Sequence, residues 1–277
     1  MSERRRRRMN IRKSITAYYY VYKIRIQKSL AYHYDVYGNI LMQCIIMFAA
    51  AFFWRALYAG ETVVQGVAAE QMYIYTVVST AMSVFFMNDV EQRVMRSVEK
   101  GTIAVEMLKP INLYGIFFFE DLGKLTALCF QNLLPIVLIG SIFIAVPKPA
   151  NMTAFLLFVL SLVMAYLIHW LLAACFSMWA FVTINMNPLL QVKKHLIRLL
   201  SGSIIPLWFF PDWLASILNC LPFVYIYQLP LDIYIGKEGM SNILPRLGIQ
   251  AVWVVALFVL FMILQKNALK KVMVQGG

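Results

Sequence analysis

Long apolar runs separated by short charged segments are the feature that most constrains the fold of this chain. A helix needs about 20 apolar residues to cross the hydrocarbon core of a bilayer. Six runs approach this length, at about 37–58, 72–88, 116–146, 152–185, 196–210 and 247–265. The third run carries charges near its start, and the fifth is short. The pattern predicts an all-α integral membrane protein with six transmembrane helices.

Composition agrees with this fold class. Hydrophobic residues make up 61% of the 277 residues and charged residues 14%, whereas a soluble domain usually carries about 25% charged residues. The formal net charge of +12 is concentrated between the apolar runs. That distribution favours contact with membrane lipid over a nucleic-acid partner.

The lysines and arginines predict the topology. Ten fall in residues 1–36, four after the second run, three after the fourth and three in the C-terminal tail, all on one side of the membrane. The other side holds four, and Lys124 lies inside a span. Positive charge marks the cytoplasmic side, so we expect both termini in the cytoplasm.

The N-terminal region precedes the six-span domain, which we place at 31–277. Residues 1–9 are predicted to be a disordered basic tail that is retained. Over 10–30, tyrosines and isoleucines interleave with basic residues. This mixture favours a helix lying in the cytoplasmic interface.

The loop between the second and third runs predicts a short amphipathic helix over 89–100. Acidic residues open it, basic residues follow, and a glycine ends it, which is the arrangement that the helix dipole favours. The residues are Asp89, Glu91, Arg93, Arg96, Lys100 and Gly101. We interpret this helix as a docking element on the cytoplasmic face, and a solvated connector is the alternative.

The segment at 201–236 is apolar and aromatic but is broken by Pro206, Pro211, Pro222 and Pro230. Proline interrupts helices, and irregular backbone is tolerated at membrane depth only when protein or a cavity covers it. We expect re-entrant short helices on the outer side at about 207–235, with a loop on the outer headgroups as the alternative.

Ionisable residues inside the runs are few. Glu120, Asp121 and Lys124 are spaced to pair with one another along one helix, and we interpret them as a structural pair near the cytoplasmic end. The alternative is a polar lining or a contact to the N-terminal helix. His169 is expected to be a hydrogen-bonded bundle histidine. The cysteines and histidines form no cluster at ligand spacing, so we predict no catalytic site and no metal site.

Four ordered segments resemble the type-2 ATP-binding-cassette (ABC) permease family, in its bacterial exporter branch. They are F-F-W-R-A-L-Y at 52–58, E-K-G-T-I-A-V-E-M-L-K-P-I-N at 99–112, F-S-M-W-A-F-V-T at 176–183 and G-S-I-I-P-L-W-F-F-P-D-W-L at 202–214. The resemblance implies that two six-span permeases pair and that each docks on a separate ABC ATPase. It implies a coupling helix at Asp89–Gly101, a connecting helix at about 10–30 and an outer gate at about 207–235, for which Pro206, Pro211 and Pro222 are the candidate residues. Spans 2 and 5 would line the path, with Met82, Phe85, Phe86 and Trp208.

The resemblance predicts a non-enzymatic permease subunit of an ABC exporter in the bacterial cytoplasmic membrane. An apolar path suggests an amphipathic or hydrophobic substrate. The chain has no G-x-x-x-x-G-K-[ST] motif, so we expect ATP and Mg²⁺ on the partner ATPase and no cofactor in this chain. A non-transporting membrane scaffold is the alternative, and an intramembrane enzyme ranks last.

The predicted topology is tested by labelling single cysteines in a variant whose four native cysteines are replaced. Positions 61–66 and 147–151 should react with an impermeant reagent added outside, and positions 100–103 and 190–194 only after permeabilisation. A reversal between these two groups would defeat the topology.

Overall fold

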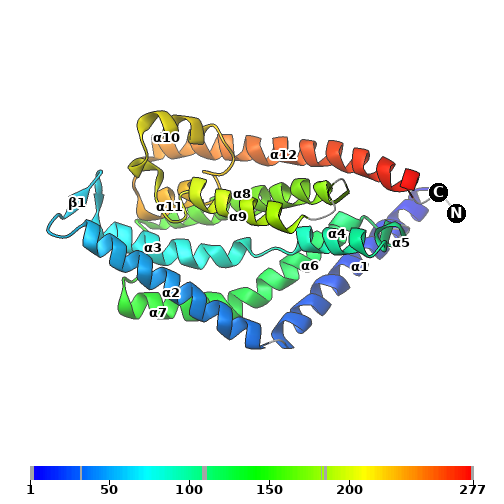
Figure 1. Ribbon diagram of the computed structural model, residues 1–277, viewed down its shortest axis with the longest axis horizontal. Helices are drawn as coiled ribbons and strands as arrows, with labels where there is room; N and C mark the ends of the chain where they lie inside the picture. The colour runs from blue at the N-terminus through cyan, green and yellow to red at the C-terminus, as the bar shows by residue number, and fades with distance from the viewer. Residues whose placement is uncertain (1–2, 32, 108–110, 182, 184–185, 276–277) are drawn as a thin grey trace.

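The computed structural model describes residues 3–31, 33–107, 111–181, 183 and 186–275, and within them it confirms the expected all-α class (Figure 1). The α-helices are α1 (Glu3–Ala31), α2 (His33–Leu57), α3 (Ala69–Ser83), α4 (Val90–Glu99), α5 (Ile103–Met107), α6 (Leu113–Leu128), α7 (Leu134–Phe143), α8 (Met152–Ser177), α9 (Asn187–Leu200), α10 (Asp212–Asn219), α11 (Gln228–Ile235) and α12 (Met240–Gln275). Short 3₁₀ helices are η1 (Val84–Phe86), η3 (Met178–Phe181) and η4 (Leu207–Phe209), and η2 (Cys129–Leu133) is a π-helix. The strands β1 (Val63–Val64) and β2 (Val67–Ala68) form an antiparallel hairpin.

Four helices of the described residues are long and apolar enough to cross a membrane: Val36–Leu57, Leu113–Phe143, Met152–Phe181 and Met240–Ala268. They correspond to the first, third, fourth and sixth predicted spans. The helices nearest to the second and fifth predicted spans are shorter: α3 has 15 residues and α9 has 14. The predicted boundaries 196–210 are wrong, because α9 ends at Leu200 and Gly202 follows with a φ of 82°. Residues 182 and 184–185, at the end of the fourth predicted span, lie outside the described part.

The two ends of the helical bundle carry different segments (Figure 1). α4, α5, the beginning of α1 and the end of α12 lie at one end. The β hairpin, α10 and α11 lie at the other. Segments that the charge distribution assigns to the cytoplasm therefore share one end of the molecule, and we call it the α4 end.

The core of the bundle lies where α3, α8 and α11 meet. Every residue of α11 is buried, and so are ten of the eleven residues of α3 between Met72 and Met82. Outer helices instead expose large apolar side chains: Leu41, Phe52, Leu138, Ile142, Leu156, Val163, Val252 and Phe258. An apolar surface of this extent requires lipid or another apolar protein surface to cover it.

The third predicted span is bent rather than straight. η2 separates α6 from α7, and Pro135 follows it. Proline lacks the N–H that would bond one turn back, which explains the local π-helix and the change of direction. As a result α6 runs obliquely toward α4, whereas α7 runs roughly along the long axis of the molecule (Figure 1).

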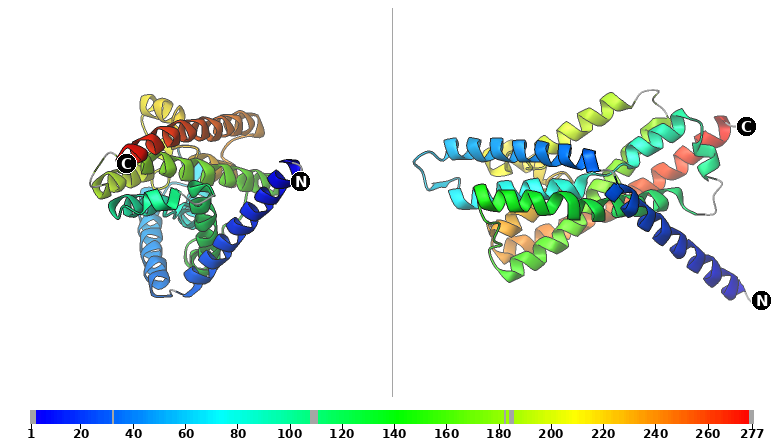
Figure 2. Two further views of the ribbon diagram at one scale, coloured as in Figure 1. Left: turned by 90° about the vertical axis from the view of Figure 1, so that its right-hand side faces the viewer. Right: turned by 90° about the horizontal axis from the view of Figure 1, so that it is seen from below.

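Helix α1 packs along α6. Tyr18 stacks on Phe119 with ring centroids 5.0 Å apart, and the Tyr22 hydroxyl lies 3.0 Å from Oγ1 of Thr126. Beyond this contact the N-terminal part of α1 projects away from the other helices (Figure 2). The exposed face of α1 carries Ile15, Tyr19, Tyr20 and Ile24, which suits an interfacial position.

The predicted disordered tail at 1–9 is wrong for the described residues, because α1 is helical from Glu3. Arginine is a good helix former, so the basic run extends the helix rather than ending it. Met1 and Ser2 lie outside the described residues, as does Pro110, which closes the predicted loop before the third span.

Gly123 should be essential to the α1–α6 contact. A Cβ at this position would lie 2.6 Å from the backbone oxygen of Tyr22, whereas a Cβ at Gly38 in α2 would have no heavy atom within 4 Å. Gly123→Ala should lower the thermal midpoint of the purified protein, because overpacking costs about 1–3 kcal/mol. Gly38→Ala should leave it unchanged or raise it. Equal midpoints for the two variants would contradict the close packing.

Candidate functional site

Helix α4 forms as its sequence predicts. It spans Val90–Glu99, and Gly101 beyond its end adopts a φ of 67°, a left-handed conformation that glycine takes without steric cost. The apolar side chains of Val90, Val94 and Met95 are buried. One face of α4 therefore packs on the bundle and fixes which side chains point inward.

Asp89, directly before α4, joins three helices. Its carboxylate accepts hydrogen bonds from Arg25 of α1 at 2.5 Å and from Lys124 of α6 at 2.6 Å. Its backbone N–H donates to Oδ1 of Asp121 at 3.1 Å. An acidic residue at the start of a helix is expected to interact with the helix dipole. The carboxylate of Asp89 instead holds α1 and α6 to the beginning of α4.

Arg93, one turn further on, binds both acidic residues of α6. Its Nη2 lies 2.8 Å from Oδ1 of Asp121, and its Nη1 contacts Glu120. Asp121 is only 1% exposed and also accepts from Nε1 of Trp170 in α8 at 3.0 Å. The buried carboxylate thus has a cation and two neutral donors, as a buried charge requires.

The predicted pairing of Lys124 with Glu120 and Asp121 is wrong. Lys124 pairs with Asp89, and both acidic residues pair with Arg93. Pairs along one exposed helix contribute only about 0.2–0.5 kcal/mol, so partners from another element replace them easily. We call the group Arg25, Asp89, Arg93, Glu120, Asp121 and Lys124 the charge cluster. It contains three cations and three carboxylates.

The electrostatics of Asp89 follow from this balance. Burial alone raises the pKa of its carboxyl, but Lys124, Arg93 and Arg25 together lower it more, so the net pKa is below its ordinary value. A carboxyl with a depressed pKa contributes stability at neutral pH. That contribution is lost when the pH falls through the pKa of the folded state.

A second set of contacts joins α4 to α8 and α9. Glu91 forms an ion pair with Lys193 of α9, and both side chains are only 7% exposed. Burial raises the pKa of Glu91 more than the Lys193 ammonium lowers it. Nδ2 of Asn88 lies 3.0 Å from Nδ1 of His169 in α8, which confirms the expected hydrogen-bonded histidine.

The outward face of α4 is polar and open. Arg96, Glu99, Lys100 and Gly101 are exposed. Of the side chains assigned to ATPase coupling, Arg96 and Lys100 are therefore free to contact a partner, whereas Asp89, Glu91 and Arg93 bind other helices of the same chain. The site can hold a partner on one face and transmit force through the other.

Comparison with known proteins identifies the family. The family model described as ABC-2 family transporter protein matches residues 44–276. The chain belongs to the ABC-2 transporter family. It is thus a membrane permease component of an ABC transporter, and the family implies association with an ABC ATPase. No curated protein and no solved structure matches the chain.

The residues assigned to the path of this ABC-2 permease differ in exposure. Met82 and Phe86 are buried, and Phe86 packs against His169 and Tyr227 with ring centroids 5.1 and 4.7 Å apart. Phe85 and Trp208 are half-buried.

The segment assigned to the outer gate folds as η4, α10 and α11. Pro206 and Pro211 directly precede η4 and α10, and Pro222 lies in the turn before α11. Pro206 and Pro222 are buried, whereas Pro211 is exposed. These three prolines lie at or near breaks, as predicted, but the predicted break at Pro230 is wrong, because Pro230 lies in the first turn of α11, where its missing N–H is tolerated.

Sequence reasoning missed the partners Arg25, Trp170 and Lys193 in this ABC-2 permease. Arg25 and Lys193 lie in basic segments that resemble ordinary cytoplasmic flanks, and Trp170 lies in an apolar run. The sequence offers only the alternative that Glu120, Asp121 and Lys124 contact the N-terminal helix. No local pattern distinguishes a paired basic residue from a solvated one.

Loss of Arg93 should destabilise the permease far more than loss of Arg96. Arg93→Met leaves Asp121 as a buried charge without its cation, which costs about 3–5 kcal/mol, whereas Arg96 is exposed. Unfolding in SDS, followed by circular dichroism, should show the difference. Adding Asp121→Asn to Arg93→Met should recover part of the loss. If Arg93→Met and Arg96→Met unfold alike, the charge cluster does not hold α4.

Proposed function

We propose that this chain is the permease of an ABC exporter and that α4 passes the motion of a separate ATPase to the transmembrane helices. The observation that carries the proposal is the two-faced environment of α4. Its inward face is bound to α1, α6 and α9 by ion pairs, and its outward face exposes Arg96, Glu99 and Lys100.

The ion pairs make α4 part of a rigid joint. A displacement of α4 acts on α1 through Asp89–Arg25, on α6 through Arg93–Asp121 and on α9 through Glu91–Lys193. Separating any of these partners would leave a poorly solvated charge, so small movements are transmitted rather than absorbed.

Motion of α9 has a direct route to the opposite end. Its C-terminus leads through Ser201 and Gly202 into the outer segment 201–236. There the Tyr75 hydroxyl of α3 donates to the carbonyl oxygen of Gly202 at 2.5 Å. In this proposal η4, α10 and α11 form the outer gate, which requires two arrangements close enough in energy for the nucleotide cycle to select between them.

The proposal places six crossings in the bacterial cytoplasmic membrane, with both termini inside. α3 with η1, and α9, would be the two short crossings. The short helix α3 is surrounded by protein, so lipid contact does not set its length. The exposed apolar surface of the outer helices would face lipid and a second permease chain.

The exported substrate would be amphipathic or hydrophobic. Of the proposed path residues, Phe85 and Trp208 keep exposed area, so they are the first to contact substrate in this arrangement. ATP and Mg²⁺ would bind on the ATPase, and this chain would carry no cofactor.

Reversing charge on the outward face of α4 should weaken association with the ATPase. A tagged full-length permease is purified from membranes, and the nucleotide-binding chain that accompanies it is quantified together with its ATP hydrolysis. Arg96→Glu with Lys100→Glu should reduce the bound ATPase about tenfold, because two rim contacts become repulsive.

The matched control is Arg55→Glu with Lys148→Glu, which makes the same change at exposed positions of the other end and should retain the ATPase. Equal loss in both variants would contradict docking on α4. Purification of the unaltered permease without any nucleotide-binding chain would favour the membrane scaffold.

A further inference from the structure

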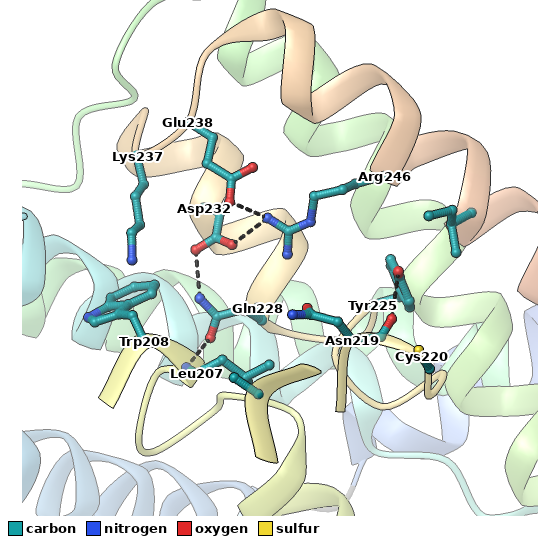
Figure 3. A pocket seen from close by; sticks show the side chains of 12 residues that line it. Leu207, Trp208, Asn219, Cys220, Tyr225, Gln228, Asp232, Lys237, Glu238 and Arg246 are labelled. Atoms are coloured by element: carbon teal, nitrogen blue, oxygen red, sulfur yellow. Dashed lines mark hydrogen bonds and ion pairs between the residues drawn. The ribbon is translucent and has the colours of Figure 1, made fainter. Parts of the chain in front are cut away.

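A cavity of about 400 Å³ opens at the end of the bundle opposite α4, beneath the turn that joins α11 to α12 (Figure 3). η4, α10, α11 and the beginning of α12 contribute its walls. Its polar lining consists chiefly of Trp208, Gln228, Asp232, Lys237, Glu238 and Arg246. The cavity thus lies within the segment proposed as the outer gate, and the opening and closing of a gate does not by itself require this combination of charged and aromatic side chains.

One wall of the cavity is a fixed carboxylate. Asp232 accepts from Nη1 of Arg246 at 3.0 Å and from Nε2 of Gln228 at 2.6 Å. Gln228 is itself held, because its Oε1 accepts from the backbone N–H of Leu207 at 2.9 Å and from the Tyr75 hydroxyl. Arg246 also binds Glu238 at 2.7 Å. This wall is therefore built before any ligand arrives.

The other wall is the face of an aromatic ring. Nζ of Lys237 lies 3.3 Å from the centroid of the Trp208 ring, and Figure 3 shows the lysine side chain reaching down to it. A cation over an indole face is attracted by about 0.5–2 kcal/mol. Within the described residues Lys237 has no ion pair, and burial lowers its pKa to about 8 despite the nearby carboxylates.

The Lys237 side chain can leave the face of the Trp208 ring without a change in the helices. It belongs to a short turn that begins at Gly236, with a φ of 68°, and reaches Gly239. Rotation of its four-carbon side chain into solvent needs no change in the helices. The remaining groups, Asp232, Glu238 and Arg246, then carry one net negative charge beside an open aromatic face.

We propose that this cavity binds an organic ammonium cation and that Lys237 occupies the site when no ligand is present. The indole face and the net negative charge are the chemistry that recognises such cations. The volume lies within the range of small-molecule sites. This inference is independent of the ATPase and goes beyond the proposed coupling.

Choline and its uncharged isostere 3,3-dimethylbutan-1-ol are suitable probes. Their binding to the full-length chain in phosphatidylglycerol nanodiscs is measured by calorimetry without nucleotide. Choline should bind and the alcohol should not. Lys237→Gln should tighten choline binding at least fivefold, because the internal competitor is gone.

Trp208→Leu should weaken choline binding about tenfold, as expected from loss of the cation–π contact, and because Trp208 is also a proposed path residue, choline binding without nucleotide is the readout and transport is not. The matched control is Trp213→Leu in α10, whose side chain is 66% exposed and should not matter. Glu238→Gln provides a second variant that removes charge without opening a cavity, and it should also weaken binding. Unchanged affinity in Lys237→Gln, or equal binding of the alcohol, would overturn the proposal.

The ammonium group could belong to a soluble compound or to a lipid headgroup. Nanodiscs that contain phosphatidylethanolamine distinguish the two sources. Weaker choline binding in these nanodiscs than in phosphatidylglycerol nanodiscs would assign the site to the headgroup, and equal binding would assign it to a soluble cation. Arg96→Glu with Lys100→Glu, which changes only exposed side chains at the α4 end, should bind choline normally, so failure here and failure of coupling are separable.

Discussion

Asp121 is a carboxylate buried in an apolar bundle, and the arrangement of the α4 end follows from the need to compensate it. Arg93 supplies the cation, and Trp170 and the backbone of Asp89 supply neutral donors. Because Arg93 must point inward, the register of α4 is fixed, and with it the set of side chains left outside. Asp89 also forms an ion pair with Arg25, so α1 is attached to the beginning of α4. A single desolvated charge thus orders three helices.

The same principle acts at the opposite end, with a different set of groups. α11 is fully buried although it contains Gln228 and Asp232, and both polar side chains are satisfied by each other, by α3 and α12 and by the first residue of η4. Between the two ends the contacts are mainly apolar. The permease therefore has two polar joints separated by an apolar body. Polar joints hold defined partners, whereas apolar contacts allow sliding, a division suited to transmitting movement over a long distance.

The sequence predicts the elements better than it predicts their partners. Hydropathy alone predicts the four long spans, Gly101 predicts where α4 ends, and Pro206 and Pro211 predict where η4 and α10 begin. α3 is harder, because burial by protein permits a helix shorter than a bilayer crossing. α9 is also short, but only Leu190, Lys193 and Ile197 are buried, so this reason does not apply to it. The pairing of Lys124 with Asp89, and of Glu91 with Lys193, depends on which helices meet in space. Spacing along one helix does not show which helices are neighbours, so it predicts pairs of Lys124 with Glu120 and Asp121 that do not form.

The charge cluster also limits how this sequence can diverge during evolution. Its cations and carboxylates are equal in number, and several contact more than one partner, so a change at one position leaves an opposite charge exposed to an apolar surrounding. Lysine does not reproduce the two-pronged contacts of Arg93 with Glu120 and Asp121. A single substitution is most costly at Asp121 and Arg93, where the charge that remains is least solvated. We therefore expect relatives of this chain to change these two residues together, so that the joint is inherited as a unit.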